Sequence, residues 1–188
     1  MSSDEQLRSD AERNRRVVLE IAIELLGRDP QASVQEIADA SGIGRTTIYR
    51  HFPSRESLLE AVTAAIIDTA RVETMAAVAD PDPEIAIRGL SAASIDLALR
   101  YGRLFAARDG QSAAYEAFKV DDTSPARRFL ATARERGTIR GDMPVEWLRS
   151  VIQAVTFTAI NEVDAGACSI EEAVQLAGDT LIAVLLAG

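Results

Sequence analysis

The chain has 188 residues, a formal net charge of -9 and a hydrophobic content of 47%. This length suits one domain, or a small domain joined to a larger one, and the hydrophobic content is sufficient for a core. The acidity argues against indiscriminate binding to nucleic acid or membranes, although it leaves room for a local basic surface.

The single cysteine, Cys168, excludes an internal disulfide and favours a reducing compartment. The N-terminal "MSSDEQLRSD" lacks the charged-then-apolar pattern of a signal peptide. The apolar run "TLIAVLLAG" is far shorter than the ~20 residues that a bilayer span requires. We therefore expect a cytoplasmic protein with no membrane partner, in which Cys168 is an inert thiol and a redox sensor is the alternative.

The first predicted helix is "RRVVLEIAIELLGRD", whose apolar residues recur at helical spacing until Gly27 and Pro30 end it. A short helix follows Ser33, because Glu36 stands three residues later, as in a capping box. Gly42 breaks this helix.

A second short helix is predicted over 45–52, with Ile48 and Phe52 one turn apart on its apolar side. Pro53 ends it, and a long helix is predicted over 55–78. The next helix is predicted over 83–100, and Gly102 is expected to separate it from a short helix around Leu104. The remaining predicted helices are 114–120, 126–136, 145–164 and 170–187. Because no alternating strand pattern or repeat is found, the predicted fold class is all-α.

The last two predicted helices are apolar on more than one face, which indicates burial on most sides. In a chain of this size, that pattern favours a partner surface, and a homodimer with twofold symmetry is the commonest arrangement. The alternative is that both helices lie centrally within one subunit. The predicted interface residues are Val151, Val155, Val174, Leu181 and Leu185.

One acid-free stretch stands out in this acidic chain. It runs from Ser41 to Arg55 and contains Arg45, Arg50 and the only histidine, His51. A helix, a turn containing glycine and a second helix form the layout of a helix-turn-helix, whose second helix can enter the major groove. An acid in that helix would repel phosphate, so its absence predicts double-stranded DNA as the partner.

The sequence "IADASGIGRTTIYRHFPSRESL" resembles the DNA-binding module of the TetR family of bacterial repressors, and the resemblance covers Ser33 to Val62. It departs from the family pattern at Gly44, where a capping serine is common, and at Thr47, which often aligns with a glycine. What the resemblance implies is a dimeric, all-helical transcription regulator. Its three-helix helix-turn-helix domain would span residues 1–54, and an all-helical effector-binding and dimerisation domain would span residues 55–188.

The resemblance also implies a palindromic operator and release of the repressor by a small apolar effector. Unpaired N–H groups at helix starts bind anions, which predicts phosphate contacts for Ser33 and Arg55. The residues implied to contact bases are Gln35, Arg45, Thr46 and Thr47, and those implied to share base and phosphate contacts are Tyr49, Arg50 and His51.

A hydrophobic effector pocket would draw on the aromatic and polar residues of the C-terminal helices. Ordinary core packing is the alternative for each of them, and a buried polar partner could equally be the second subunit or a backbone group. The predicted pocket residues are Tyr101, Phe105, Tyr115, Phe118, Phe129, Trp147, Gln153, Thr156 and Phe157.

Two other functional classes compete with this one. The first is a DNA-binding regulator without an effector, controlled by its abundance or by a protein partner. The second is an enzyme, for which the sequence offers no convincing carboxylate pair, phosphate loop or metal cluster. We therefore expect no enzymatic activity, no cofactor and no metal.

Overall fold

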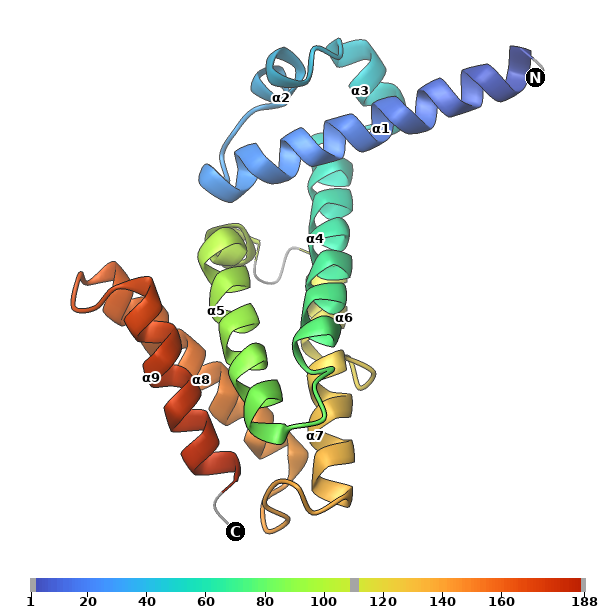
Figure 1. Cartoon of the computed structure of the whole chain (residues 1–188). Helices are drawn as coiled ribbons and strands as arrows, with labels where there is room; N and C mark the ends of the chain where they lie inside the picture. The colour runs from blue at the N-terminus through green and yellow to red at the C-terminus, as the bar shows by residue number, and fades with distance from the viewer. Residues whose placement is uncertain (1–2, 109–111, 187–188) are drawn as a thin grey trace. The chain divides into compact units, whose positions relative to one another are not determined.

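The computed structural model describes residues 3–108 and 112–186, and the regular structure within these ranges is entirely helical (Figure 1). This confirms the all-α prediction. The helices are α1 (Ser3–Arg28), α2 (Val34–Ser41), α3 (Arg45–His51), α4 (Arg55–Ala77), α5 (Pro83–Ala107), α6 (Ala113–Lys119), α7 (Pro125–Glu135), α8 (Val145–Asp164) and α9 (Ile170–Leu185). No helix in the described ranges is both long and apolar enough to cross a membrane.

Two helices extend further than their apolar patterns predicted. α1 begins at Ser3, well before the fully buried Val18, because its polar first turns consist largely of residues with good helix propensity. α5 continues through Gly102, where a break was predicted. A glycine inside a helix costs about 1 kcal/mol, and burial of Leu104 two residues later offsets that cost.

The chain forms two compact units. The first comprises Met1–Ile67 and Tyr101–Lys119, and the second comprises Asp68–Arg100 and Val120–Gly188. α4 and α5 therefore each contribute residues to both units.

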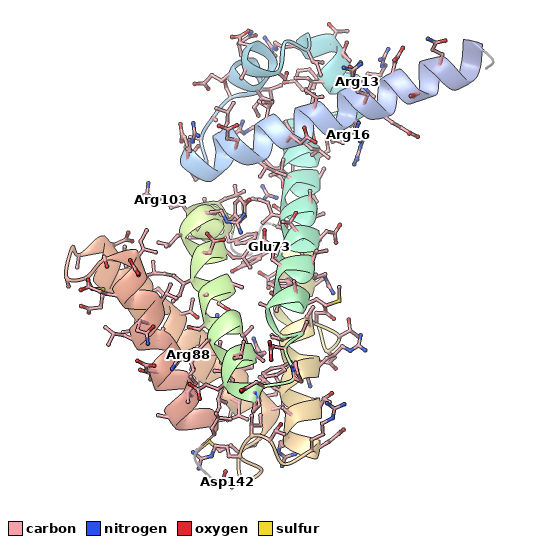
Figure 2. The ribbon with its side chains drawn as sticks, viewed as in Figure 1. Arg13, Arg16, Glu73, Arg88, Arg103 and Asp142 are labelled. Carbon is pink, nitrogen blue, oxygen red and sulfur yellow. The ribbon has the colours of Figure 1, made fainter. Side chains whose placement is uncertain are left out.

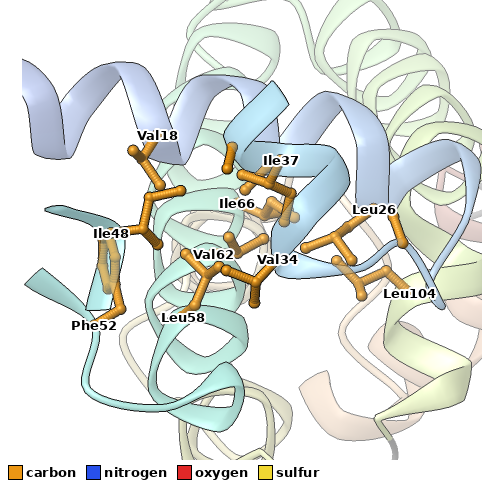
Figure 3. Packing of buried hydrophobic residues seen from close by; sticks show 13 residues of the cluster. Val18, Leu26, Val34, Ile37, Ile48, Phe52, Leu58, Val62, Ile66 and Leu104 are labelled. Atoms are coloured by element: carbon orange, nitrogen blue, oxygen red, sulfur yellow. The ribbon is translucent and has the colours of Figure 1, made fainter. Parts of the chain in front are cut away.

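In the first unit, the first three helices and the start of α4 share one hydrophobic core, shown in close-up in Figure 3. Because Leu58, Val62 and Ile66 of α4 belong to this core, the compact unit extends past residue 54. The functional division at residue 54 remains a prediction. The core residues labelled in Figure 3 are Val18, Leu26, Val34, Ile37, Ile48, Phe52, Leu58, Val62, Ile66 and Leu104.

In the second unit, α5, α7, α8 and α9 pack around two separate groups of buried residues. The large cluster comprises Ile87, Leu90, Leu130, Ala133, Ile139, Leu148, Ile152, Leu181 and Leu185. The small cluster comprises Ile95, Ala159, Ala173 and Ala177, and the half-buried Cys168 packs against it. Half-buried Val155 contacts both clusters.

Candidate nucleic-acid interface

α2 begins with the predicted capping box. The backbone N–H and the hydroxyl of Ser33 both donate to Oε2 of Glu36 at 2.7 Å, and Ser33 Oγ accepts from the Glu36 backbone N–H at 3.2 Å. The backbone hydrogen bond from Ser33, followed by that of its hydroxyl, lowers the pKa of Glu36 below its ordinary value of 4.5. A carboxylate therefore already occupies the start of α2, where the sequence predicted a phosphate contact for Ser33.

Gly42 ends α2 with φ of 68°, in the left-handed region that favours glycine. This turn allows α3 to start at Arg45. Gly44 occupies the N-cap of α3 and offers no side-chain hydrogen bond to the helix. The departure from the family pattern at this position therefore leaves α3 without a side-chain cap.

α3 separates residues that hold the fold from residues that face outward. Ile48 and Phe52 are buried in the core of the first unit, at 1% and 3% exposure. Arg15 of α1 places its guanidinium carbon 5.4 Å from the centre of the Phe52 ring, which adds a cation–π contact. Four of the predicted DNA-contacting residues on α3 are exposed, namely Arg45, Thr46, Tyr49 and Arg50.

Thr47 and His51 are half-buried, and His51 Nε2 has no hydrogen-bond partner within the described ranges. The structure thus brings all six predicted residues of α3 onto one short helix, with four of them open to solvent.

Arg45 lies at the junction of α2 and α3. Its Nη1 donates to Gln35 Oε1 at 3.5 Å, and its guanidinium carbon lies 5.9 Å from the centre of the Tyr49 ring. Gln35 in turn donates to Asp39 at 2.6 Å. Asp39 was missed by the sequence analysis, although its i,i+4 spacing from Gln35 is a detectable signal.

These residues surround an open hollow of about 480 Å³, lined by Gln35, Ala38, Asp39, Gly42, Ile43, Gly44 and Arg45. The hollow places a predicted base-reading pair, Gln35 and Arg45, at one surface.

Arg55 has a different environment from the one predicted. Its Nη1 donates to the Ala32 carbonyl at 2.5 Å and its Nη2 donates to the Pro30 carbonyl at 3.3 Å. The guanidinium thus joins the start of α4 to the segment between α1 and α2. Two of the five N–H groups of this guanidinium are therefore engaged by backbone carbonyls.

A second group of contacts also holds the start of α4. Arg108 is 3% exposed, and its Nη2 donates to Glu56 at 2.7 Å and to Glu60 at 3.2 Å. The backbone N–H of Ala114 donates to Glu60 at 2.7 Å. Burial raises the pKa of Glu60, but hydrogen bonds from Ala114, Ser112 and Arg108 outweigh burial and hold that pKa below its ordinary value of 4.5. We call Arg108, Glu56 and Glu60 the Arg108 latch.

The predicted effector residues are divided between the two units. Tyr101, Phe105, Tyr115 and Phe118 belong to the first unit, where the Phe105 and Tyr115 rings stack with their centres 4.7 Å apart. The second unit contains the other five, Phe129, Trp147, Gln153, Thr156 and Phe157.

Within the second unit, only part of this set faces the interior. Phe129 packs against the large cluster and Thr156 is buried, whereas Gln153 is exposed. Trp147 and Phe157 are 60% and 65% exposed. Their outward position suits an intermolecular contact better than an internal pocket.

The predicted interface residues lie deeper than expected. Leu181 and Leu185 are fully buried in the large cluster, and Val151, Val155 and Val174 are half-buried against the two clusters. The broad apolar pattern of α8 and α9 therefore partly reflects packing within the subunit, which was the alternative reading.

Across the described residues, no group of three or more His, Cys, Asp or Glu side chains is arranged to hold a metal ion.

The sequence and the fold both have known relatives. Residues 18–62 match the family described as bacterial regulatory proteins, tetR family. The chain is 29% identical over 153 residues to the HTH-type transcriptional repressor LfrR of Mycolicibacterium smegmatis, which covers 77% of this chain and 76% of LfrR.

Two solved structures extend the likeness to the fold. LfrR from Mycobacterium smegmatis in complex with proflavine superposes with a TM-score of 0.69 at 24% identity, covering 90% of this chain and 94% of that one. A protein with unknown function from Rhodococcus superposes with a TM-score of 0.74 at 21% identity, covering 92% and 95%. The helix-turn-helix part of the chain, residues 18–62, thus matches the tetR family of bacterial regulatory proteins, and the chain is similar to the repressor LfrR in sequence and in fold.

Proposed function

We propose that this regulator is a homodimer that inserts α3 into the major groove of a palindromic operator and responds to a small apolar effector. The acid-free exposed face of α3 carries the proposal, because buried Ile48 and Phe52 hold that face in position. Two recognition helices would lie about 34 Å apart, one turn of DNA, or a multiple of that spacing.

Arg45 is the proposed base-reading residue. Arginine can bind O6 and N7 of guanine together. The contacts of Arg45 with Gln35 and Tyr49 are long and therefore weak, so a base can replace them. Thr46 offers a methyl group to thymine, while Thr47 and His51 are half-buried and would contribute less.

Phosphate contacts are proposed for Arg50 and Tyr49, which are exposed on the same helix. Gln35 would join Arg45 in reading bases. Ser33 and Arg55 are given structural roles, because Ser33 bonds to Glu36 and Arg55 donates to two backbone carbonyls.

For dimerisation, we propose the exposed face of α8 and α9 with a second copy of the chain as the occupant. Phe157 on α8 and Leu176 on α9 are 65% and 61% exposed, and small residues such as Ala154 and Ala183 lie exposed nearby in sequence. Aromatic residues are enriched in the cores of interfaces, and twofold pairing is the commonest symmetry.

An effector response is proposed for the C-terminal helices. LfrR has been solved in complex with proflavine, so small-molecule binding occurs in a related protein. The division of the predicted aromatic residues between two units favours the alternative of a regulator without an effector. A ligand changes DNA affinity only if it binds the two conformational states unequally.

Fluorescence anisotropy tests DNA recognition. The probe is the DNA upstream of the protein's own gene, with unrelated DNA as control, across a salt series. We expect tight binding to the upstream DNA alone. If binding is equally weak and salt-sensitive on both DNAs, the next experiment is a selection from random DNA. A selection that enriches no sequence would refute sequence-specific recognition.

Variants assign the roles. Arg45→Ala should weaken binding unequally across operator variants, by about 1–3 kcal/mol at the contacted base. Arg128→Ala, an exposed arginine of α7 in the second unit, removes the same charge and should leave binding unchanged. Equal effects of the two substitutions would contradict the base contact.

The dimer is tested by light scattering after size-exclusion chromatography. Phe157→Glu should shift the protein toward the monomer, because an unpaired charge in an apolar interface is costly. Ile85→Glu, at an apolar α5 residue that is 53% exposed, introduces the same charge outside the proposed face. A Phe157→Glu protein that stays as dimeric as Ile85→Glu would place the interface elsewhere.

A further inference from the structure

Two helices of the second unit bury hydroxyl groups that have no hydrogen-bond partner. Ser91 on α5 is 0% exposed and Thr156 on α8 is 9% exposed. Neither Ser91 Oγ nor Thr156 Oγ1 has a partner within the described part of the chain. An unpaired buried hydroxyl is unfavourable, and such exceptions in native proteins call for an explanation.

Several other helical hydroxyls of this chain are satisfied by their own helix, through the carbonyl four residues earlier. Thr63 donates to the Leu59 carbonyl at 2.9 Å, and Thr158, two residues beyond Thr156, donates to the Ala154 carbonyl at 3.0 Å. Thr63 is as completely buried as Ser91, so burial does not prevent this bond. The hydroxyls of Ser91 and Thr156 therefore lack a bond that the fully buried hydroxyl of Thr63 makes.

Along their helices, Ser91 and Thr156 both lie between residues of the large cluster and residues of the small cluster. On α5, Ser91 lies four residues from Ile87 of the large cluster and four from Ile95 of the small cluster. One turn in each direction on a helix marks the same face. Ser91 thus lies at the boundary between the two clusters.

Thr156 has the same placement on α8. It lies four residues after Ile152 of the large cluster and three residues before Ala159 of the small cluster. On α9, the residue between Ala177 and Leu181 at this level is the buried Gly178, which has no side chain. The boundary between the clusters therefore combines two unpaired hydroxyls with a glycine.

The charges near this boundary are already paired. The stem of Arg88 crosses Gly178, with its Cγ 3.5 Å from where a Cβ would stand. Its guanidinium reaches Asp179 at 2.7 Å and Glu84 at 3.2 Å, extending from α5 toward α9 (Figure 2). The buried members of both clusters are aliphatic.

We propose that Ser91 and Thr156 form the polar end of a binding site for a neutral aliphatic molecule with one hydroxyl, carbonyl or amide group. A hydroxyl can both donate and accept, so the pair suits any of these head groups. A charged head group would lose its hydration without finding a counter-ion. The regulatory consequence of binding rests on the proposed function, whereas binding itself does not.

Isothermal titration of the full chain with three probes of equal chain length tests the ligand class. The probes are 1-decanol, decanoate and decyltrimethylammonium. We expect saturable binding of 1-decanol, with at least tenfold weaker binding of both ions. Saturable binding of none of the three, or a preference for either ion, would overturn the proposal.

Variants test the two hydroxyls. Ser91→Ala and Thr156→Val should each weaken 1-decanol binding about three- to tenfold, as expected for one hydrogen bond. Thr158→Val is the matched control, because that exposed hydroxyl is bonded to its own helix. The same affinity in all four proteins would show that the hydroxyls do not hold the probe.

A measurement without any probe gives an independent test. Thr156→Val replaces an unpaired hydroxyl with a methyl group of similar size, so the melting temperature should rise. Thr63→Val removes a satisfied hydroxyl, so the melting temperature should fall. A Thr156→Val protein that loses as much stability as Thr63→Val would mean that this hydroxyl has a structural role.

Operator binding by the same variants separates this site from the proposed function. Without a probe, Ser91→Ala and Thr156→Val should bind the operator as the unchanged chain does. Failure of every protein to bind operator DNA would refute the DNA proposal and leave the alcohol site standing. Loss of the preference for 1-decanol would refute the site and leave DNA binding standing.

Discussion

The DNA-binding module and the C-terminal helices place their candidate functional residues in opposite environments. On α3, the candidates Arg45, Thr46 and Arg50 are exposed while Ile48 is buried, so the candidate contact residues differ from the residue that packs in the core. In the second unit, Thr156 lies among the residues that also build the core.

This difference determines whether the type of a residue can indicate a functional role. Exposed arginines in a segment without acids, such as Arg45 and Arg50, have no neighbouring acid in that segment to pair with, whereas a buried aliphatic or aromatic residue always has a structural reason. A ligand site in the second unit must therefore be recognised from buried polar groups that lack a hydrogen-bond partner, which is the argument for Ser91 and Thr156.

The first prediction separates fold from function on α3. Ile48→Ala should lower the free energy of unfolding by roughly 2–4 kcal/mol, because a fully buried side chain leaves a cavity. Thr46→Ala, on the exposed side, should change it by less than about 0.5 kcal/mol but weaken operator binding. Urea denaturation and anisotropy measure the two effects. Equal destabilisation by both substitutions would contradict the division of roles.

The second prediction concerns the Arg108 latch, which joins Glu56 and Glu60 at the start of α4 to a residue far along the chain. Arg108→Met should cost about 1–3 kcal/mol of stability, because it removes a buried guanidinium from Glu56 and Glu60. Arg103→Met, at an exposed position of α5 five residues before Arg108, removes the same charge and should be near neutral. Thermal unfolding of the two variants decides, and matching melting temperatures would argue against the latch.

The third prediction compares two glycines. Gly42→Ala should destabilise the protein by about 1–2 kcal/mol, because φ at this turn is 68°. Gly102→Ala should instead stabilise it by up to about 1 kcal/mol, because an added Cβ within α5 meets nothing within 4 Å. The denaturant midpoints of the two variants show whether each substitution lowers or raises the stability. Stabilisation by Gly42→Ala would refute the assigned turn.

The smallest expected effect is a pH dependence. The pKa of Glu60 is lower in the folded chain than its ordinary value of 4.5, so its contribution is present above pH 4.5 and disappears as the pH falls through the folded pKa. Glu60→Gln should therefore reduce the loss of stability on acidification. Glu135→Gln, at an exposed position of α7, controls for net charge. Parallel stability curves for the two variants would exclude a role for Glu60.

Local signals explain why the helix-turn-helix was predictable. Ser33 and Glu36 are three residues apart, and Gly42 needs only its own φ, so neighbouring residues determine both features. The position of α3 and the burial of Ile48 follow from the same local pattern.

Contacts between distant residues were not predictable in this way. Arg55 donates to Ala32, 23 residues earlier in the chain, and no local pattern predicted this contact. Leu181 lies on an apolar stripe that fits an interface and a core equally well, and only the packing of α9 shows that it is buried.

The solitary thiol of Cys168, half-buried in the turn between α8 and α9, has a practical consequence. Each subunit carries one attachment point for a spin label, and no other cysteine has to be removed first. In a twofold dimer the two labels would be related by symmetry, so electron paramagnetic resonance would report one distance between subunits. A change in that distance on adding operator DNA or an alcohol would record the motion of α8 and α9 directly.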